Sequence, residues 1–573
     1  MKRLLKYLKD YKKECVLAPL FKMLEAVFEL TVPLVIAHMI DDGIRGGASS
    51  VILSSFILLL VLAAVGLIVS CTAQYFAAKA ATGFSKELRH DLFSHIMSFG
   101  FCEIDRIGTS TMITRMTVDV NALQNGVNMF LRLFLRSPFI VAGAMVMAFT
   151  IDVKAALVFV LVIAVLSIVV TIVMKTNIPL LTSAVKKLDD VLCLVRENLS
   201  GARVVRAFAK EEDQIRAFGD ANSELTAISL KAGRISGLLN PLTYVIINLA
   251  IVLLVNVGSV QLDKGILTTG QIVALYNYMS QILIELIKFA NLVITLNRSL
   301  ASAGRVNAIF DEKNGMDVSA DASFDITDDA PAIEFNDVSL KYHKDADEAI
   351  GGISFKIDKG KTLGIIGGTG SGKSTIASLI PRFYDASSGD VYVGGKNVKD
   401  IEITGLRRNV GIVMQRAVLF EGSIRENLKW GCEDATDEDI NEAVRLAVCE
   451  DVVSSKGGLD AMIEAGGRNL SGGQRQRLSI ARVLVSKPKI LILDDSSSAL
   501  DYMTDEKLRN NIASLSYDPT VVIIAQRTIS VQNADAILVL DDGRMVGFGT
   551  HEELLSSCEV YKEIYDSQMS AVS

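Results

Sequence analysis

Apolar residues are unevenly distributed along the 573-residue chain. Before about residue 300 they form long runs, and after about residue 330 they form short runs interrupted by glycine and charge. A bilayer core requires about 20 mainly apolar residues for each spanning helix. Six stretches meet this requirement: 15–40, 51–78, 133–151, 155–174, 241–262 and 270–297. The pattern therefore predicts an all-α transmembrane domain of six helices over residues 1–310, followed by a soluble domain.

Lysine and arginine gather in alternate connections between the predicted spans. The N-terminal segment MKRLLKYLKDYKKE is lysine-rich, and the stretches 79–132 and 175–240 carry many further basic residues. Because basic connections remain in the cytosol, we expect the N-terminus and the soluble domain to be cytoplasmic, with the spans in the cell inner (plasma) membrane. Both basic stretches exceed 50 residues and have helical sequences. We therefore expect the spanning helices to continue beyond the bilayer as stalks.

Polar residues recur at helical spacing within the first and last predicted spans. In the last span, Asn277, Gln281, Glu285 and Lys288 fall on one stripe of a helix. Lys22, Glu25 and Glu29 form a similar stripe in the first span. Because charged side chains avoid hydrocarbon, the stripe in the last span is a candidate lining for a substrate cavity. Local ion pairs between residues i and i+3 are the alternative interpretation.

The soluble domain begins after an acidic stretch, residues 311–331, that we interpret as a linker. Within the expected domain, 332–573, the segment TLGIIGGTGSGKST places a G-x-x-x-x-G-K-S pattern between an apolar strand and an apolar helix. This is the context of a phosphate-binding loop in an α/β P-loop domain. Its expected nucleotide-binding residues are Gly367, Thr369, Gly370, Ser371, Gly372, Lys373, Ser374 and Thr375. Lys373 would contact the β- and γ-phosphates of ATP, and Ser374 would bind Mg²⁺.

Two further segments complete the candidate chemistry. Asp494 ends the apolar strand in KILILDDSSSALD and is a candidate Mg²⁺ ligand. The SGG of NLSGGQRQRLSIARVL can present backbone N–H groups at a helix start, which makes a second anion site. One domain cannot easily bring both sites to the same phosphate, so a second domain is implied.

The net charge and the cysteine pattern argue against nucleic-acid binding, a disulfide framework and a zinc site. A net charge of −7 gives no basic surface of the kind that binds nucleic acid, so we expect no nucleic-acid partner. The seven cysteines are scattered without a CxxC pair, which argues against a disulfide framework or a zinc site.

With these motifs, the chain resembles a half-transporter of the ATP-binding cassette (ABC) exporter superfamily, in which six membrane helices precede one cytosolic cassette. The resemblance implies that Tyr342 stacks on adenine, that Gln415 contacts Mg²⁺, and that Asp501 closes a dimer contact. It identifies LSGGQ as the signature that acts on the ATP of a second subunit, comprising Leu470, Ser471, Gly472, Gly473 and Gln474. DRIGTSTMITRMTVDV and VVRAFAKEEDQIRAF resemble the two cytoplasmic loops that press on the cassettes.

The chain departs from the family pattern at two catalytic positions. Asp495 replaces the glutamate that positions the attacking water, and Gln526 replaces the histidine that contacts the γ-phosphate. Aspartate is one methylene shorter, so its oxygens retreat by roughly 1.5 Å, and a misplacement of about 1 Å can cost 10²-fold in rate. Glutamine is never charged, unlike histidine. We therefore expect a site that binds ATP and rarely hydrolyses it. A slow but working site is the alternative.

A weakened ATP site beside an intact signature resembles the degenerate-site subunit of bacterial heterodimeric multidrug-type exporters. The partner would be a second ABC half-transporter that supplies the glutamate and the histidine. The expected cofactors are ATP and Mg²⁺, and the other expected partners are membrane lipid and a small amphiphilic substrate (drug, lipid or peptide). A homodimeric exporter with two slow sites and an ATP-gated channel or regulator remain as alternatives.

Overall fold

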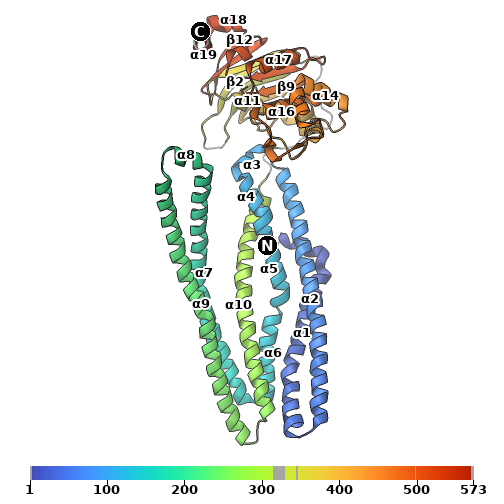
Figure 1. The fold of residues 1–573 in the computed structure, drawn as a ribbon, viewed down its shortest axis with the longest axis vertical. Coiled ribbons are helices and arrows are strands. Elements are labelled where there is room, and N and C mark those ends of the chain that lie inside the picture. Colours follow the sequence, from blue (N-terminus) through green and yellow to red (C-terminus); the bar gives the residue numbers. More distant parts are fainter. Residues whose placement is uncertain (1–2, 314–315, 317–329, 343–345, 497, 570–573) are drawn as a thin grey trace. The chain divides into compact units, whose positions relative to one another are not determined.

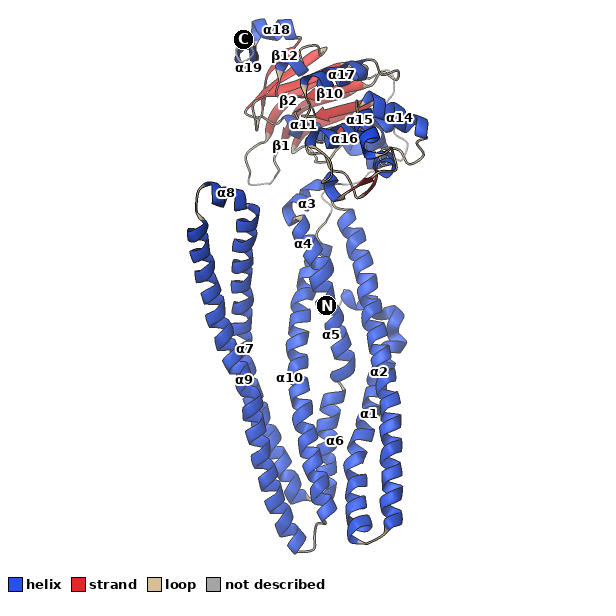
Figure 2. Ribbon diagram, in the orientation of Figure 1, coloured by secondary structure: helices blue, strands red, loops and turns tan. Residues whose placement is uncertain are grey.

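The structure is a computed structural model that describes residues 3–313, 316, 330–342, 346–496 and 498–569. The chain separates into two units, the first comprising residues 1–97 and 110–312 and the second comprising residues 98–109 and 313–573. Most of the predicted linker, residues 311–331, lies outside the described residues. Figure 2 shows that the first unit is helical, whereas strands and helices mix in the second.

The first unit contains six helical segments that are long and apolar enough to cross a membrane: Leu4–Arg45, Ser49–Met97, Thr109–Ile151, Val153–Ser200, Glu211–Asp263 and Thr269–Asp311. This confirms the prediction of six spans. The segments divide into η1 (Leu4–Tyr11), α1 (Lys12–His38), η2 (Met39–Arg45), α2 (Ser49–Met97), α4 (Thr109–Thr114), η3 (Arg115–Asp119), α5 (Val120–Leu133), α6 (Arg136–Ile151), α7 (Val153–Ser200), α8 (Ala202–Ala207), α9 (Glu211–Asp263) and α10 (Thr269–Asp311). Helices therefore continue through most of both long basic stretches, as expected of stalks.

Local sequence explains where these helices start and stop. Asp152 caps α7 by accepting a hydrogen bond from the Ala155 backbone N–H at 2.7 Å. Thr268 and Gln271 form a reciprocal capping box at the start of α10. The third span is interrupted between α5 and α6, just before Pro138. Proline has no backbone N–H and is tolerated in the first turn of a helix, so a new helix, α6, begins there.

Small residues allow the spanning helices to pack closely. On α6, Ala144 and Ala148 lie four residues apart and are fully buried in a core shared with α1, α7, α9 and α10. Small side chains at such spacing allow membrane helices to approach closely. By contrast, α2 exposes large apolar side chains such as Phe56 and Leu60, which suits contact with lipid.

The second unit is built on a six-stranded sheet of order β12-β11-β3-β10-β9-β6, with a four-stranded antiparallel sheet of order β2-β1-β4-β5 and the pair β7-β8. The strands are β1 (Ile333–Leu340), β2 (Ile350–Ile357), β3 (Thr362–Gly367), β4 (Ser388–Val393), β5 (Lys396–Asn397), β6 (Val410–Val413), β7 (Gly422–Ser423), β8 (Met462–Ile463), β9 (Ile490–Asp494), β10 (Thr520–Ile524), β11 (Ala536–Asp541) and β12 (Arg544–Gly549). In the larger sheet, β3, β10 and β9 are parallel neighbours, so their carboxyl ends meet at one edge.

Helices pack around these sheets. They are α11 (Lys373–Leu379), α12 (Ile403–Asn409), α13 (Ile424–Lys429), α14 (Asp437–Leu446), α15 (Glu450–Lys456), α16 (Gly472–Val485), α17 (Tyr502–Ala513), α18 (His551–Ser557) and α19 (Glu559–Met569). The short helix α3 (Phe101–Ile107) also belongs to this unit, although it comes from the chain between α2 and α4. The α/β fold expected of the soluble domain is confirmed.

Candidate functional site

A cavity of about 290 Å³ lies at the carboxyl edge of the parallel strands. It is lined by Tyr342, Ala349, Thr369, Gly370, Ser371, Gly372, Lys373, Ser374, Thr375, Gln415, Asp494, Asp495, Ile524 and Gln526. Every residue predicted to bind nucleotide or metal, or to take part in hydrolysis, therefore lines one cavity, except Gly367. That glycine is the last residue of β3, the strand that leads into the loop.

The loop between β3 and α11 wraps around the side chain of Lys373. Its ammonium donates hydrogen bonds to the carbonyls of Gly367 at 2.9 Å and Gly368 at 2.5 Å. Burial lowers the pKa of Lys373, while the carboxylates of Asp494 and Asp495 oppose that shift. Gly372 has a φ of +93°, which L-residues rarely adopt, and a Cβ there would lie 2.4 Å from Ile350. Backbone geometry thus explains the glycine ahead of the lysine.

Three oxygen-bearing side chains of the cavity suit a magnesium ion. The Ser374 hydroxyl donates to Asp494 Oδ1 at 2.9 Å, and Gln415 lines the same cavity. Hydroxyl, carboxylate and amide oxygens are hard ligands of the kind that Mg²⁺ prefers. Burial raises the pKa of the Asp494 carboxyl. A divalent cation at this place would compensate the buried negative charge.

The carboxylate of Asp495 is held by two amides. Its Oδ2 accepts hydrogen bonds from Gln415 Nε2 at 3.2 Å and Gln526 Nε2 at 3.1 Å. Asp495 is 9% exposed and has a φ of +46°. The two residues that depart from the family pattern therefore bond directly to each other. A water molecule at Oδ2 would compete with both amides.

Aromatic residues form the side of the cavity that contains Tyr342. Its hydroxyl lies 3.0 Å from Thr375 Oγ1, and its ring packs edge-on against Tyr384 at 5.0 Å between centroids. Helix α3 packs on the same aromatic group, because Phe101 stacks on Phe383 at 4.4 Å and Asp105 accepts a 2.5 Å hydrogen bond from Tyr384. Asp105 opens the first of the two predicted cytoplasmic loops.

The signature residues lie apart from this cavity, since none of them lines it. Ser471 caps α16 by accepting from the Gln474 backbone N–H at 3.3 Å, while Gln474 Oε1 accepts from the Ser471 N–H at 2.9 Å. Gly472 is exposed, and a Cβ added there would have no atom within 4 Å. Asp501 caps α17 by accepting from the Thr504 N–H at 3.0 Å. The start of α16 thus presents an open backbone surface.

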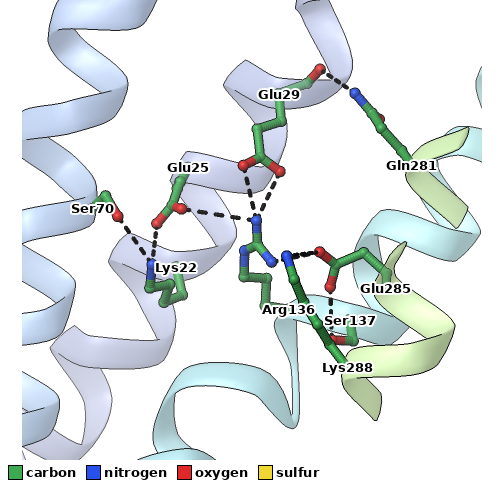
Figure 3. A network of polar contacts seen from close by, with 9 residues as sticks. All are labelled: Lys22, Glu25, Glu29, Ser70, Arg136, Ser137, Gln281, Glu285 and Lys288. Atoms are coloured by element: carbon green, nitrogen blue, oxygen red, sulfur yellow. Dashed lines mark hydrogen bonds and ion pairs between the residues drawn. The ribbon is translucent and has the colours of Figure 1, made fainter. Parts of the chain in front are cut away.

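In the membrane unit, the predicted stripe of α10 meets a buried arginine (Figure 3). Glu285 is 3% exposed and accepts from Arg136 Nη1 at 2.7 Å, Lys288 Nζ at 2.8 Å and Ser137 Oγ at 2.8 Å. Arg136 Nη2 also donates to both oxygens of Glu29, at 2.9 and 2.8 Å. One guanidinium therefore joins α1, α6 and α10.

The other polar residues of the two stripes take different places. Lys22 Nζ donates to Glu25 at 2.5 Å and to Ser70 of α2 at 3.1 Å. Gln281 Nε2 donates to the Glu29 carbonyl at 3.2 Å, and Asn277 Nδ2 to the carbonyl four residues before it at 3.1 Å. Of the four predicted cavity residues, only Lys288 lines the cavity of about 440 Å³ in this region.

The structure therefore contains features of both interpretations of the stripes, the ion pairs and the cavity. The i,i+3 ion pairs form between Lys22 and Glu25 and between Glu285 and Lys288, and a cavity lies beside them. Arg136 had no predicted role and Arg132 lay in a predicted cytoplasmic stretch, yet both line this cavity. The position of Arg136 inside a predicted span could have identified it as a candidate functional residue from sequence alone.

Comparisons with known proteins agree with this architecture. A family model described as "ABC transporter transmembrane region" matches residues 15–286, and one described as "ABC transporter" matches residues 350–498. The uncharacterized ABC transporter ATP-binding protein YfiB of Bacillus subtilis is 35% identical over 569 residues, covering 99% of this chain and 98% of its own length. The putative multidrug export ATP-binding/permease protein YgaD of the same organism is 31% identical over 580 residues, covering 99% of both chains.

A solved structure has the same fold. The structure of a bacterial Atm1-family ABC exporter with ATP bound matches with a TM-score of 0.81 at 23% identity, over 97% of this chain and 98% of that one.

Proposed function

Because this chain belongs to the ABC transporters and has the fold of an ATP-driven exporter, we propose that it is one subunit of a heterodimeric exporter of amphiphilic compounds. In this proposal the chain binds Mg²⁺ and ATP at a site that hydrolyses slowly. It supplies its signature to the hydrolytic site of a partner half-transporter that has the glutamate and the histidine. The subunit crosses the plasma membrane with its N-terminus and ATP-binding domain in the cytoplasm.

The contacts of Asp495 are the observation that carries the proposal. A water-positioning carboxylate must reach the water with a free oxygen in the correct place. Asp495 has the shorter arm, and its Oδ2 already accepts from Gln415 and Gln526. The Gln526 amide donates a hydrogen bond to the Asp495 carboxylate. Because the amide is uncharged, it cannot offer the γ-phosphate the positive charge that a protonated histidine could. Both changes reduce the same chemistry in the same cavity.

The signature supports the other half of the proposal. The capped N-terminus of α16 and the open surface at Gly472 suit phosphate binding by backbone N–H groups. The signature motif of this chain is intact, whereas its own ATP site is weakened. This combination favours a heterodimer in which this chain contributes its signature and the partner hydrolyses ATP. The name of one relative, a putative multidrug exporter, supports amphiphilic compounds as the substrate class.

The test compares two variants in the complex purified from native membranes. Asp495→Asn keeps the size of the side chain and should reduce steady-state ATP hydrolysis only modestly, because this pocket is mostly idle. Gly472→Ala keeps the backbone N–H but adds a methyl group that would hold the partner's phosphate away from it, and because a displacement of about 1 Å can cost 10²-fold in rate, hydrolysis should fall by about 10²-fold. A methyl group at Gly472 contacts nothing in its own chain, so folding should not change.

A homodimer would respond differently. Both variants would then affect the only sites present, and each would abolish hydrolysis. Equal damage by the two variants, at equal amounts of purified complex, would overturn the division of labour and make Asp495 a working catalytic base.

A further inference from the structure

The partly buried charge network of the membrane unit contains more positive than negative groups. Its carboxylates are Glu25, Glu29 and Glu285, and its cations are Lys22, Arg132, Arg136 and Lys288. Each carboxylate has a cation: Glu25 pairs with Lys22, Glu29 with Arg136, and Glu285 with both Arg136 and Lys288 (Figure 3). Three negative charges therefore face four positive ones.

Arg132 is the group without a partner. Among residues 3–313, which the structure describes without a gap, it forms no ion pair or hydrogen bond, and its Nε is buried and unpaired. It lies just before the break between α5 and α6, and Arg136 lies just after that break. Both arginines line the cavity of about 440 Å³. Lys288 also lines it, with 42% of its side chain exposed.

The depth of the network suits the head group of an amphiphile. Helix α6 runs 16 residues from Arg136 to Ile151, which is about 24 Å at 1.5 Å per residue. The hydrocarbon core of a bilayer is about 30 Å thick. Measured from the short connection at Asp152, which the proposed orientation places at the outer surface, Arg136 lies inside the core near its cytoplasmic side, and Arg132, four residues earlier, lies at that cytoplasmic boundary.

We infer that this cavity binds the acidic head group of an amphiphilic substrate, with Arg132 as the cation that contacts it and Lys288 beside it. This inference rests on the proposed exporter function. An unpaired cation at the boundary of the membrane core, with a buried Nε and a cavity beside it, is a candidate contact for a ligand. One added anion would bring the charge of the network to zero. A guanidinium also holds carboxylate and phosphate oxygens in a bidentate geometry.

Binding to three amphiphiles with the same twelve-carbon chain tests the inference: dodecyl phosphate, dodecanol and dodecylamine. We expect the purified complex to bind dodecyl phosphate most tightly. Arg132→Gln should weaken that binding by about tenfold or more, the effect expected for one charge-assisted hydrogen bond. Binding of dodecanol should not change. Arg132→Lys keeps the charge but not the bidentate guanidinium, so it should weaken binding less than Arg132→Gln does.

Arg234→Gln is the matched control, because Arg234 is exposed on α9 and does not line the cavity. It should bind all three compounds like the unmodified protein. Equal affinity for the three compounds, or no effect of Arg132→Gln, would overturn the inference and leave the exporter function intact. Stimulation of ATP hydrolysis by bound dodecyl phosphate would identify a substrate site. Binding without stimulation would indicate a lipid site and overturn the substrate assignment.

Discussion

At the scale of single residues, the backbone at Asp495 favours aspartate over the longer glutamate. Its φ of +46° lies in the left-handed region, which aspartate and asparagine enter more readily than other residues with a side chain. Its N–H donates to the Ile524 carbonyl at 3.0 Å, and its carbonyl accepts from Ser498 Oγ at 2.9 Å. These bonds fix the backbone, so the position of the carboxylate depends on the length of the arm.

Tyr342 provides a prediction about nucleotide affinity. Tyr342→Ala should weaken ATP binding at this chain's site by about 5- to 150-fold, since stacking between an aromatic ring and a base is worth about 1–3 kcal/mol. Tyr342→Phe is the control, because it keeps the ring and removes only the contact with Thr375. A binding titration with ATP measures both variants. Unchanged affinity in the alanine variant would contradict the stacking role.

The phosphate-binding loop could be predicted from sequence because its spacing dictates a local backbone. Gly372 and Lys373 lie next to each other in the chain, and their geometry follows from the turn that glycine allows. The hydrogen bonds of Asp495 could not be predicted in the same way. Gln415 and Gln526 approach it from segments far apart in sequence, and only the order of strands in the sheet brings them together.

At the scale of elements, hydrophobic length was sufficient to find the six spans, but it could not show how their polar faces pair. Arg136 is the fourth residue of the predicted span 133–151, and its partners lie on α1 and α10. The pairing depends on how three helices pack, and the stripe of α10 alone does not contain that information. Sequence alone therefore identified the stripe of Glu285 but missed the arginine that binds it.

The pairing of α6 with α10 leads to a stability prediction. Arg136→Met should destabilise the membrane unit by about 3–5 kcal/mol, because it leaves the buried Glu285 without a main partner. The double variant Arg136→Met, Glu285→Met removes both buried charges and leaves Glu29 and Lys288, whose side chains are each 42% exposed and can be solvated, so it should recover most of the loss. The measurement is the temperature at which half of the detergent-solubilised chain loses its monodisperse elution. A double variant as unstable as the single one would show that the ion pair is not the cause.

At the scale of the whole molecule, the signature lies apart from the candidate ATP cavity, so in the proposed function one chain alone is incomplete. The cavity has the predicted phosphate-binding loop and candidate metal ligands, and the exposed start of α16 lies outside it. ABC exporters work as dimers of half-transporters, and in the proposed function each ATP is completed by the signature of the other chain. In the proposed heterodimer, the two ATP sites are then chemically different. The complex should therefore hydrolyse the ATP at one site much faster than the ATP at the other.

This asymmetry predicts which nucleotide remains bound after turnover. When the purified complex has hydrolysed ATP and is rapidly desalted, we expect a comparable amount of bound, intact ATP for each copy of this chain. Asp495→Glu with Gln526→His restores the longer carboxylate and a group that can be charged, so the retained nucleotide should become ADP. Asp495→Glu alone tests the effect of side-chain length separately. A glutamate at this position must also adopt the strained φ of +46°. Nucleotide extracted from the protein and separated by chromatography measures the ratio. If the unmodified complex retains only ADP, both sites hydrolyse ATP and the proposed asymmetry is wrong.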